Sequence, residues 1–142
     1  MHYSVDPFMS ILVPSHDALL SVILPDTVTS FCWTAKYDVH VINQLPPGSK
    51  LTLHCASKDN DLGHHTLANN QEFQWHFCDH WLGHTLFFCT FGWGSKKQSF
   101  DVFTSKFGND LCFGGVCFWL ARSDGFYFHG FKRSTSKLYE WK

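Results

Sequence analysis

The sequence carries little charge, and its absences exclude several classes of protein. Charged residues make up only 16% of the 142 residues, and the 11 Lys and Arg are nearly balanced by 12 Asp and Glu. Because no basic cluster is present to neutralise phosphates, we predict no nucleic-acid partner. No apolar run reaches the roughly 18 to 20 residues that span a bilayer, so we also predict no membrane insertion.

Catalytic signatures are missing as well. The chain has no phosphate-binding glycine loop, no dinucleotide fingerprint and no CxxC pair, and its acidic residues form no distinguished couple. Ten histidines invite a metal interpretation, but His76, His80 and His84 share one face only on a helix. The alternation around them indicates a strand and a loop instead. We therefore predict no enzyme activity, no cofactor and no metal site.

One cysteine keeps a hydrolase among the alternatives. Cys78 lies two residues from both His76 and His80, and a thiol activated by a neighbouring imidazole is a nucleophile. No oxyanion hole can be identified beside it. Hydrolysis is therefore the least favoured of the functions considered.

The start of the chain differs from the rest, because all eleven Lys and Arg lie beyond it. Apolar runs at 8–13 and 18–24 resemble the hydrophobic part of a secretion signal, although prolines interrupt them and no positive residue precedes them. We interpret 1–35 as a signal-like or misassigned N-terminal segment, with cleavage near Ala35 in the first case. Residues 36–142 then form one domain of ordinary size.

Within this domain, period-two alternation predicts short strands and no long helix. The predicted strands lie at 37–42, 51–55, 73–78, 85–91, 100–103, 117–121, 125–128 and 138–141. Polar stretches at 57–63, 92–98 and 106–110 are interpreted as loops or turns. Strands at this spacing predict an all-β fold, a small antiparallel β-sandwich or barrel of seven or eight strands.

Aromatic residues occupy one face of several predicted strands. Phe73, Trp75 and Phe77 alternate with polar residues, which is the pattern of a strand with one side buried. Such faces line a core more often than a ligand pocket. We therefore assign these side chains to the core.

Cysteine is frequent for so small a chain. The six residues are Cys32, Cys55, Cys78, Cys89, Cys112 and Cys117. This number without a CxxC pair is typical of disulfides formed in an oxidising compartment, with buried free thiols as the alternative. The sequence thus favours a secreted, extracellular protein.

Several blocks of the chain resemble the plant self-incompatibility S-protein homologues. In order, they are VHVINQL (39–45), LTLHCASKDNDLG (51–63), FQWHF (73–77), TLFFC (85–89), FDVF (100–103) and DGFY (124–127). The resemblance covers about residues 37–142 and is specific, because the blocks agree in order and spacing. Two departures are Ala56, where the family usually has a basic residue, and Asn60, where it has an acidic one.

The resemblance implies a small secreted β-sandwich stapled by two disulfides among four cysteines. These are Cys55, Cys89, Cys112 and Cys117. Four cysteines allow three pairings, and sequence alone does not select one. We expect Cys55 to pair with Cys117, and Cys89 with Cys112.

Cys78 is additional to the family's usual four cysteines and lies on the polar face of its predicted strand. We expect it to be a free thiol. A bridge to another molecule and a bridge to Cys32 are the alternatives, the second only if Cys32 is retained in the mature chain.

The resemblance also implies a function. Family members are secreted ligands, so we expect a ligand of plant cell–cell recognition and self-incompatibility-type signalling that binds a cell-surface receptor. An extracellular carbohydrate- or lipid-binding module is the alternative from another class. Partner binding is expected in loops, where side chains can vary without disturbing the core. The candidate partner-binding residues are Lys58, Asp59, Asp61, His64, His65, Lys96, Lys97, Lys106, Asn109, Asp110, Lys132 and Arg133.

Overall fold

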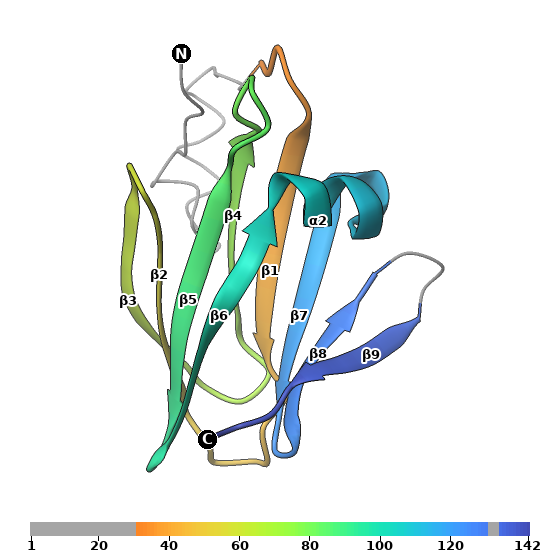
Figure 1. Cartoon of the computed structure of the whole chain (residues 1–142). Coiled ribbons are helices and arrows are strands. Elements are labelled where there is room, and N and C mark those ends of the chain that lie inside the picture. Colours follow the sequence, from red (N-terminus) through yellow and green to blue (C-terminus); the bar gives the residue numbers. More distant parts are fainter. Residues whose placement is uncertain (1–30, 131–133) are drawn as a thin grey trace, which may run out of the picture.

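The computed structural model describes residues 31–130 and 134–142, which form two packed β-sheets (Figure 1). The strands are β1 (Lys36–Asn43), β2 (Leu51–Ser57), β3 (Asp61–Leu67), β4 (Glu72–Cys78), β5 (Leu86–Trp93), β6 (Lys96–Thr104), β7 (Val116–Arg122), β8 (Gly125–His129) and β9 (Thr135–Tyr139). One sheet has the order β4-β1-β7-β8-β9, and the other has the order β3-β2-β5-β6. Helix α2 (Ser105–Leu111) and a 3-10 turn, η3 (Phe113–Gly115), connect β6 to β7.

The predicted all-β sandwich is confirmed, with nine strands in the part of the chain that the structure describes. The additional strand is β3, so the predicted loop at 57–63 is wrong beyond Asn60. This strand lies at a sheet edge, and its outward side chains, including His64 and Thr66, are exposed. An edge strand with one face in water needs few apolar residues, which is why the sequence of this strand resembles that of a polar loop.

The other two predicted loops are also shorter or more regular than expected. Strand β5 extends to Trp93 and β6 begins at Lys96, so the turn within 92–98 is tight. The stretch 106–110 belongs to α2 rather than to a turn. The hydroxyl of Thr104 accepts the backbone N–H of Phe107, which caps the start of this helix.

The sheet pairings are mostly those expected of an antiparallel sandwich. Six of the seven pairings between described strands are antiparallel, whereas β1 and β7 run parallel, with Val41 beside Trp119. Parallel neighbours require a long connection between them. Here that connection includes the whole second sheet. The pairing of β1 with β7 therefore joins the N-terminal part of the domain to its C-terminal part.

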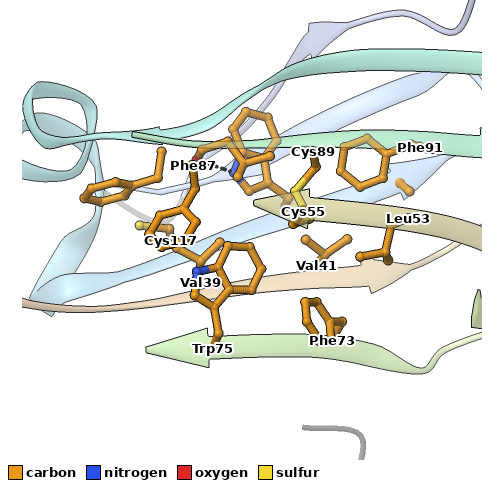
Figure 2. Packing of buried hydrophobic residues seen from close by; sticks show 14 of the residues in the cluster. Val39, Val41, Leu53, Cys55, Phe73, Trp75, Phe87, Cys89, Phe91 and Cys117 are labelled. Atoms are coloured by element: carbon orange, nitrogen blue, oxygen red, sulfur yellow. Dashed lines mark hydrogen bonds between the residues drawn. A yellow bond between two sulfur atoms is a disulfide. The ribbon is translucent and has the colours of Figure 1, made fainter. Parts of the chain in front are cut away.

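The core lies between the sheets and is rich in aromatic side chains, as predicted. Figure 2 labels part of this cluster, namely Val39, Val41, Leu53, Cys55, Phe73, Trp75, Phe87, Cys89, Phe91 and Cys117. Trp119 of β7 is 1% exposed, and its indole N–H donates to the carbonyl oxygen of Val102 in β6 at 3.0 Å. This hydrogen bond joins the two sheets through the core.

All six cysteines lie within the described residues, and all are paired. The pairs are Cys32–Cys78, Cys55–Cys89 and Cys112–Cys117. The expected pairing of Cys55 with Cys117 and of Cys89 with Cys112 is therefore wrong. Cys55 and Cys89 face each other on neighbouring strands, with their Cα atoms 4.0 Å apart. Cys117 lies on the other sheet and bonds to Cys112, five residues earlier.

The expected free thiol at Cys78 is also wrong, because Cys78 bonds to Cys32. Cys78 is thus not the nucleophile that the hydrolase alternative requires. Two further contacts hold the residues before β1 beside the end of β4. The Thr34 hydroxyl donates to the carbonyl oxygen of Asp79 at 2.6 Å, and the Asp79 N–H donates to the Ala35 carbonyl oxygen at 2.8 Å.

The last residues of the chain close one end of the sandwich. The backbones of Lys97 and Lys142 exchange two hydrogen bonds, of 3.1 and 2.9 Å. The Trp141 indole N–H donates to the Arg122 carbonyl oxygen at 2.8 Å, and its ring packs 4.6 Å from that of Phe126. The C-terminal segment therefore bridges both sheets. Among the described residues, no helix is long and apolar enough to cross a membrane.

Candidate recognition surfaces

The sandwich has two ends that differ in character (Figure 1). We define the helix end as residues 31–35, 58–60, 79–85 and 105–115, and the C-terminal end as residues 94–97, 122–125 and 139–142. Register places the first set together, because the end of β2 pairs with the start of β5, and the start of β5 pairs with the end of β6. The nine residues of β6 separate the two ends by about 30 Å.

The structure distributes the predicted partner-binding residues over both ends and over β3. Those at the helix end are Lys58, Asp59, Lys106, Asn109 and Asp110. Within α2, Lys106 and Asp110 form an exposed ion pair of 3.0 Å. Such a pair contributes little stability in water, so both charged groups remain available to a partner.

The remaining candidates lie elsewhere. Lys96 and Lys97 begin β6 at the C-terminal end, and the Lys96 ammonium lies 5.5 Å from the ring centre of Trp93. Asp61, His64 and His65 belong to β3 rather than to a loop. Lys132 and Arg133 lie outside the described residues. The predicted residues therefore do not form a single surface.

Exposed apolar side chains mark the helix end, and nothing in the sequence distinguishes them from core residues. Six of the nine large hydrophobic residues exposed in the described part of the chain lie there, namely Phe31, Trp33, Trp81, Leu82, Leu111 and Phe113. Trp81 is 59% exposed and Phe113 is 69% exposed. Exposed apolar groups gathered beside charged ones are characteristic of protein–protein interaction sites.

A hydrogen-bond network holds the loop that carries Trp81. One carboxylate oxygen of Asp79 accepts the hydroxyls of Thr85 at 2.7 Å and Ser105 at 2.6 Å. The Thr85 N–H donates to the Ser105 hydroxyl oxygen at 2.9 Å, and the His80 N–H donates to the Thr85 hydroxyl oxygen at 2.7 Å. The loop 79–85 is thus fixed to the start of α2, which presents its apolar side chains in a preorganised position.

Tyr37 lies beneath this network. Its ring packs 4.8 Å from that of Phe103 and 6.0 Å from that of Phe77. Burial, and to a smaller extent the nearby charge of Asp79, raise the pKa of the Tyr37 hydroxyl above its ordinary value. Tyr37 therefore packs in the core as a neutral phenol near the helix end.

Histidines on the second sheet make specific contacts. The imidazole rings of His54 and His64 stack across β2 and β3 with their centres 4.0 Å apart, and His54 Nε2 lies 2.7 Å from a carboxylate oxygen of Asp61. The Gly63 N–H first, and then His54, hold the pKa of Asp61 below its ordinary value. In residues 31–130 and 134–142, no group of three His, Cys, Asp or Glu could hold a metal ion.

These features define a small disulfide-bonded β-sandwich protein with exposed apolar side chains gathered at one end. Residues 38–141 match the family model described as plant self-incompatibility protein S1. The chain belongs to this family, which confirms the resemblance read from its sequence.

Similar proteins agree with this assignment. S-protein homolog 29 of Arabidopsis thaliana is 36% identical over 108 residues, which cover 75% of this chain and 78% of that protein. S-protein homolog 20 of the same plant is 40% identical over 91 residues, covering 62% of this chain and 65% of the relative.

A solved structure shares the fold. It is described as a self-incompatibility protein homologue from a widespread family of small, highly stable, secreted proteins from plants. Its TM-score is 0.63 at 23% identity, and the match covers 78% of this chain and 97% of that one. At this identity the likeness supports the architecture alone.

Proposed function

We propose that this protein is a secreted ligand in plant cell–cell recognition and that the extracellular part of a cell-surface receptor binds its helix end. Family membership and the description of its structural relative as secreted support this proposal. Three disulfides suit an oxidising compartment outside the cytosol. The proposed role is binding and not catalysis.

The gathering of exposed apolar side chains at the helix end carries the proposal. Trp81 and Phe113 have the character of interface anchors, because large aromatic residues dominate binding energy when a partner buries them. Lys58, Asp59 and Lys106 at the same end would form the polar rim that sets orientation and specificity. The network around Asp79 lowers the cost of ordering the Trp81 loop on binding.

The test uses a variant that removes both anchors, Trp81→Ser with Phe113→Ser. Labelled, disulfide-intact protein is titrated onto plant plasma-membrane vesicles with their outer face exposed. We expect saturable binding of the natural protein, lost when proteins on the vesicle surface are digested. The double variant should bind at least tenfold more weakly, because each buried aromatic anchor contributes on the order of 1 to 2 kcal/mol or more.

The matched control is Leu138→Ser on β9, where the leucine is 45% exposed but lies away from the helix end. This variant should bind like the natural protein. Equal binding of all three proteins would show that the helix end is not the interface. The absence of any protein-dependent, saturable binding would contradict the proposed ligand function itself.

A further inference from the structure

The outer face of the second sheet carries a shallow hollow of about 400 Å³, away from the helix end. Its lining spans all four strands and combines hydroxyl, imidazole and ammonium groups. Some lining residues alternate along their strands with buried residues, so their side chains lie on the outer face of the sheet. They are Thr52, His54, His64, Thr66, Thr90 and Lys97. The hollow therefore combines polar groups with the carbon surfaces of their side chains and of Leu53 and Phe91 beneath them.

Strand register arranges these groups in two rows across the sheet. One row runs Thr66, Thr52, Gly92 and Lys97, and the other runs His64, His54, Thr90 and Ser99. Four neighbouring strands span about 14 Å, because each lies roughly 4.8 Å from the next. This width and the open floor suit an extended ligand with polar groups along its length.

Gly92 keeps the middle of the first row open. A Cβ atom at this position would lie 2.6 Å from the hydroxyl oxygen of Thr52. Any larger residue here would therefore require the Thr52 hydroxyl to move. Glycine allows this hydroxyl to lie close to the β5 backbone, where it donates to the Gly92 carbonyl oxygen at 3.3 Å.

The hollow favours an anionic ligand. Its lining contains no Asp or Glu, whereas it contains Lys97. Lys97 forms no ion pair with another of the described residues. Asp61 accepts a hydrogen bond from the Gly63 N–H and lies 2.7 Å from His54 Nε2, so it orients the imidazole pair at the edge of the hollow. The positive charge of Lys97 is thus left for a ligand.

The hydroxyls favour a ligand with many hydroxyl groups of its own. The Ser99 hydroxyl donates to the Thr90 hydroxyl oxygen at 2.9 Å, so the Thr90 hydrogen can point towards a ligand. A simple phosphate would contact only a small part of a surface this wide. A lipid chain would leave the hydroxyl, imidazole and ammonium groups of this face without hydrogen-bond partners.

We propose that this hollow binds an oligosaccharide that carries uronate groups. The carboxylate of one sugar would pair with the Lys97 ammonium. The ring hydroxyls would exchange hydrogen bonds with Thr52, Thr66 and Thr90 and with the imidazoles of the second row. The site goes beyond the proposed receptor contact, because it occupies a different face of the sandwich.

The test is calorimetric titration of the purified, disulfide-intact protein with a uronic-acid trisaccharide. The same trisaccharide with its carboxylates reduced to alcohols serves as the neutral comparison. We expect binding of the acidic sugar and at least tenfold weaker binding of the neutral one. Lys97→Met should reduce affinity for the acidic sugar by at least tenfold, because it keeps the aliphatic stem and removes the charge.

Lys96→Met is the matched control, since this neighbouring lysine lies over Trp93 instead of the hollow. It should leave saccharide affinity unchanged, as should the helix-end double variant, which separates this site from the receptor contact. Equal affinity of the natural protein and the Lys97→Met variant would overturn the proposal. So would a failure to bind the acidic trisaccharide, or its full displacement by an equal concentration of inorganic phosphate.

Discussion

Replacing Cys55 and Cys89 together with alanine is expected to lower the free energy of unfolding by about 4 kcal/mol and the thermal midpoint by roughly 15 °C. The bridge closes a loop of 34 residues, so its loss releases much chain entropy in the unfolded state. Both sulfurs lie in the buried cluster between the sheets (Figure 2), so their removal also weakens core packing.

The control for this prediction is the double alanine variant of Cys112 and Cys117. That bridge closes a loop of only five residues, so the same entropy argument gives about 2 kcal/mol. Denaturant unfolding of both variants beside the natural protein measures the difference. A larger loss from the short bridge than from the Cys55–Cys89 bridge would contradict the assigned role of the core disulfide.

Replacing Trp119 with alanine is expected to cost about 4 kcal/mol of unfolding free energy. Its ring is fully enclosed and packs 5.0 Å from Phe100 and 5.1 Å from Phe128. The substitution leaves a large cavity. It also removes the hydrogen bond that the indole N–H donates to the Val102 carbonyl oxygen, which then lacks this partner. Trp81→Ala on the surface should change stability by less than about 0.5 kcal/mol.

A second comparison separates the indole hydrogen bond from packing. The Trp75 indole N–H is buried and has no hydrogen-bond partner among residues 31–130 and 134–142. Trp75→Phe should therefore cost less than Trp119→Phe, which loses a hydrogen bond of about 1 kcal/mol. Denaturant unfolding compares the two variants. An equal or larger cost at Trp75 would show that ring volume, and not the hydrogen bond, decides both effects.

Much of the sandwich could be predicted because strand alternation is a local property. Phe73, Trp75 and Phe77 repeat at a period of two, and the structure buries all three. Strand β3 was not predicted, because its exposed face carries the polar residues His64 and Thr66. Its extended conformation is evident only from its pairing with β2. The parallel neighbours β1 and β7 lie far apart in the sequence, so no local pattern predicts that they pair.

The disulfides and the proposed binding surfaces depend on strand order, which the sequence does not state. Cys55 meets Cys89 only because β2 and β5 are neighbours. Trp81 and Phe113 are large aromatic residues of the kind usually found in a core. Only the folded structure shows that both side chains are exposed. The hollow depends on the register of four strands, and Gly92 allows the close approach of Thr52.

The most direct test of the central claim, a secreted and disulfide-bonded ligand, is the intact mass of the protein from plant cells that express the full chain. We expect it in the medium and gaining six hydrogens on reduction, two for each bridge. Because Cys32 forms one of these bridges, the secreted protein should begin at or before Cys32, earlier than the cleavage near Ala35 that the sequence suggested. Peptides linked through Cys55–Cys89 should be recovered without reduction. Retention inside the cells with reactive cysteines would contradict the account.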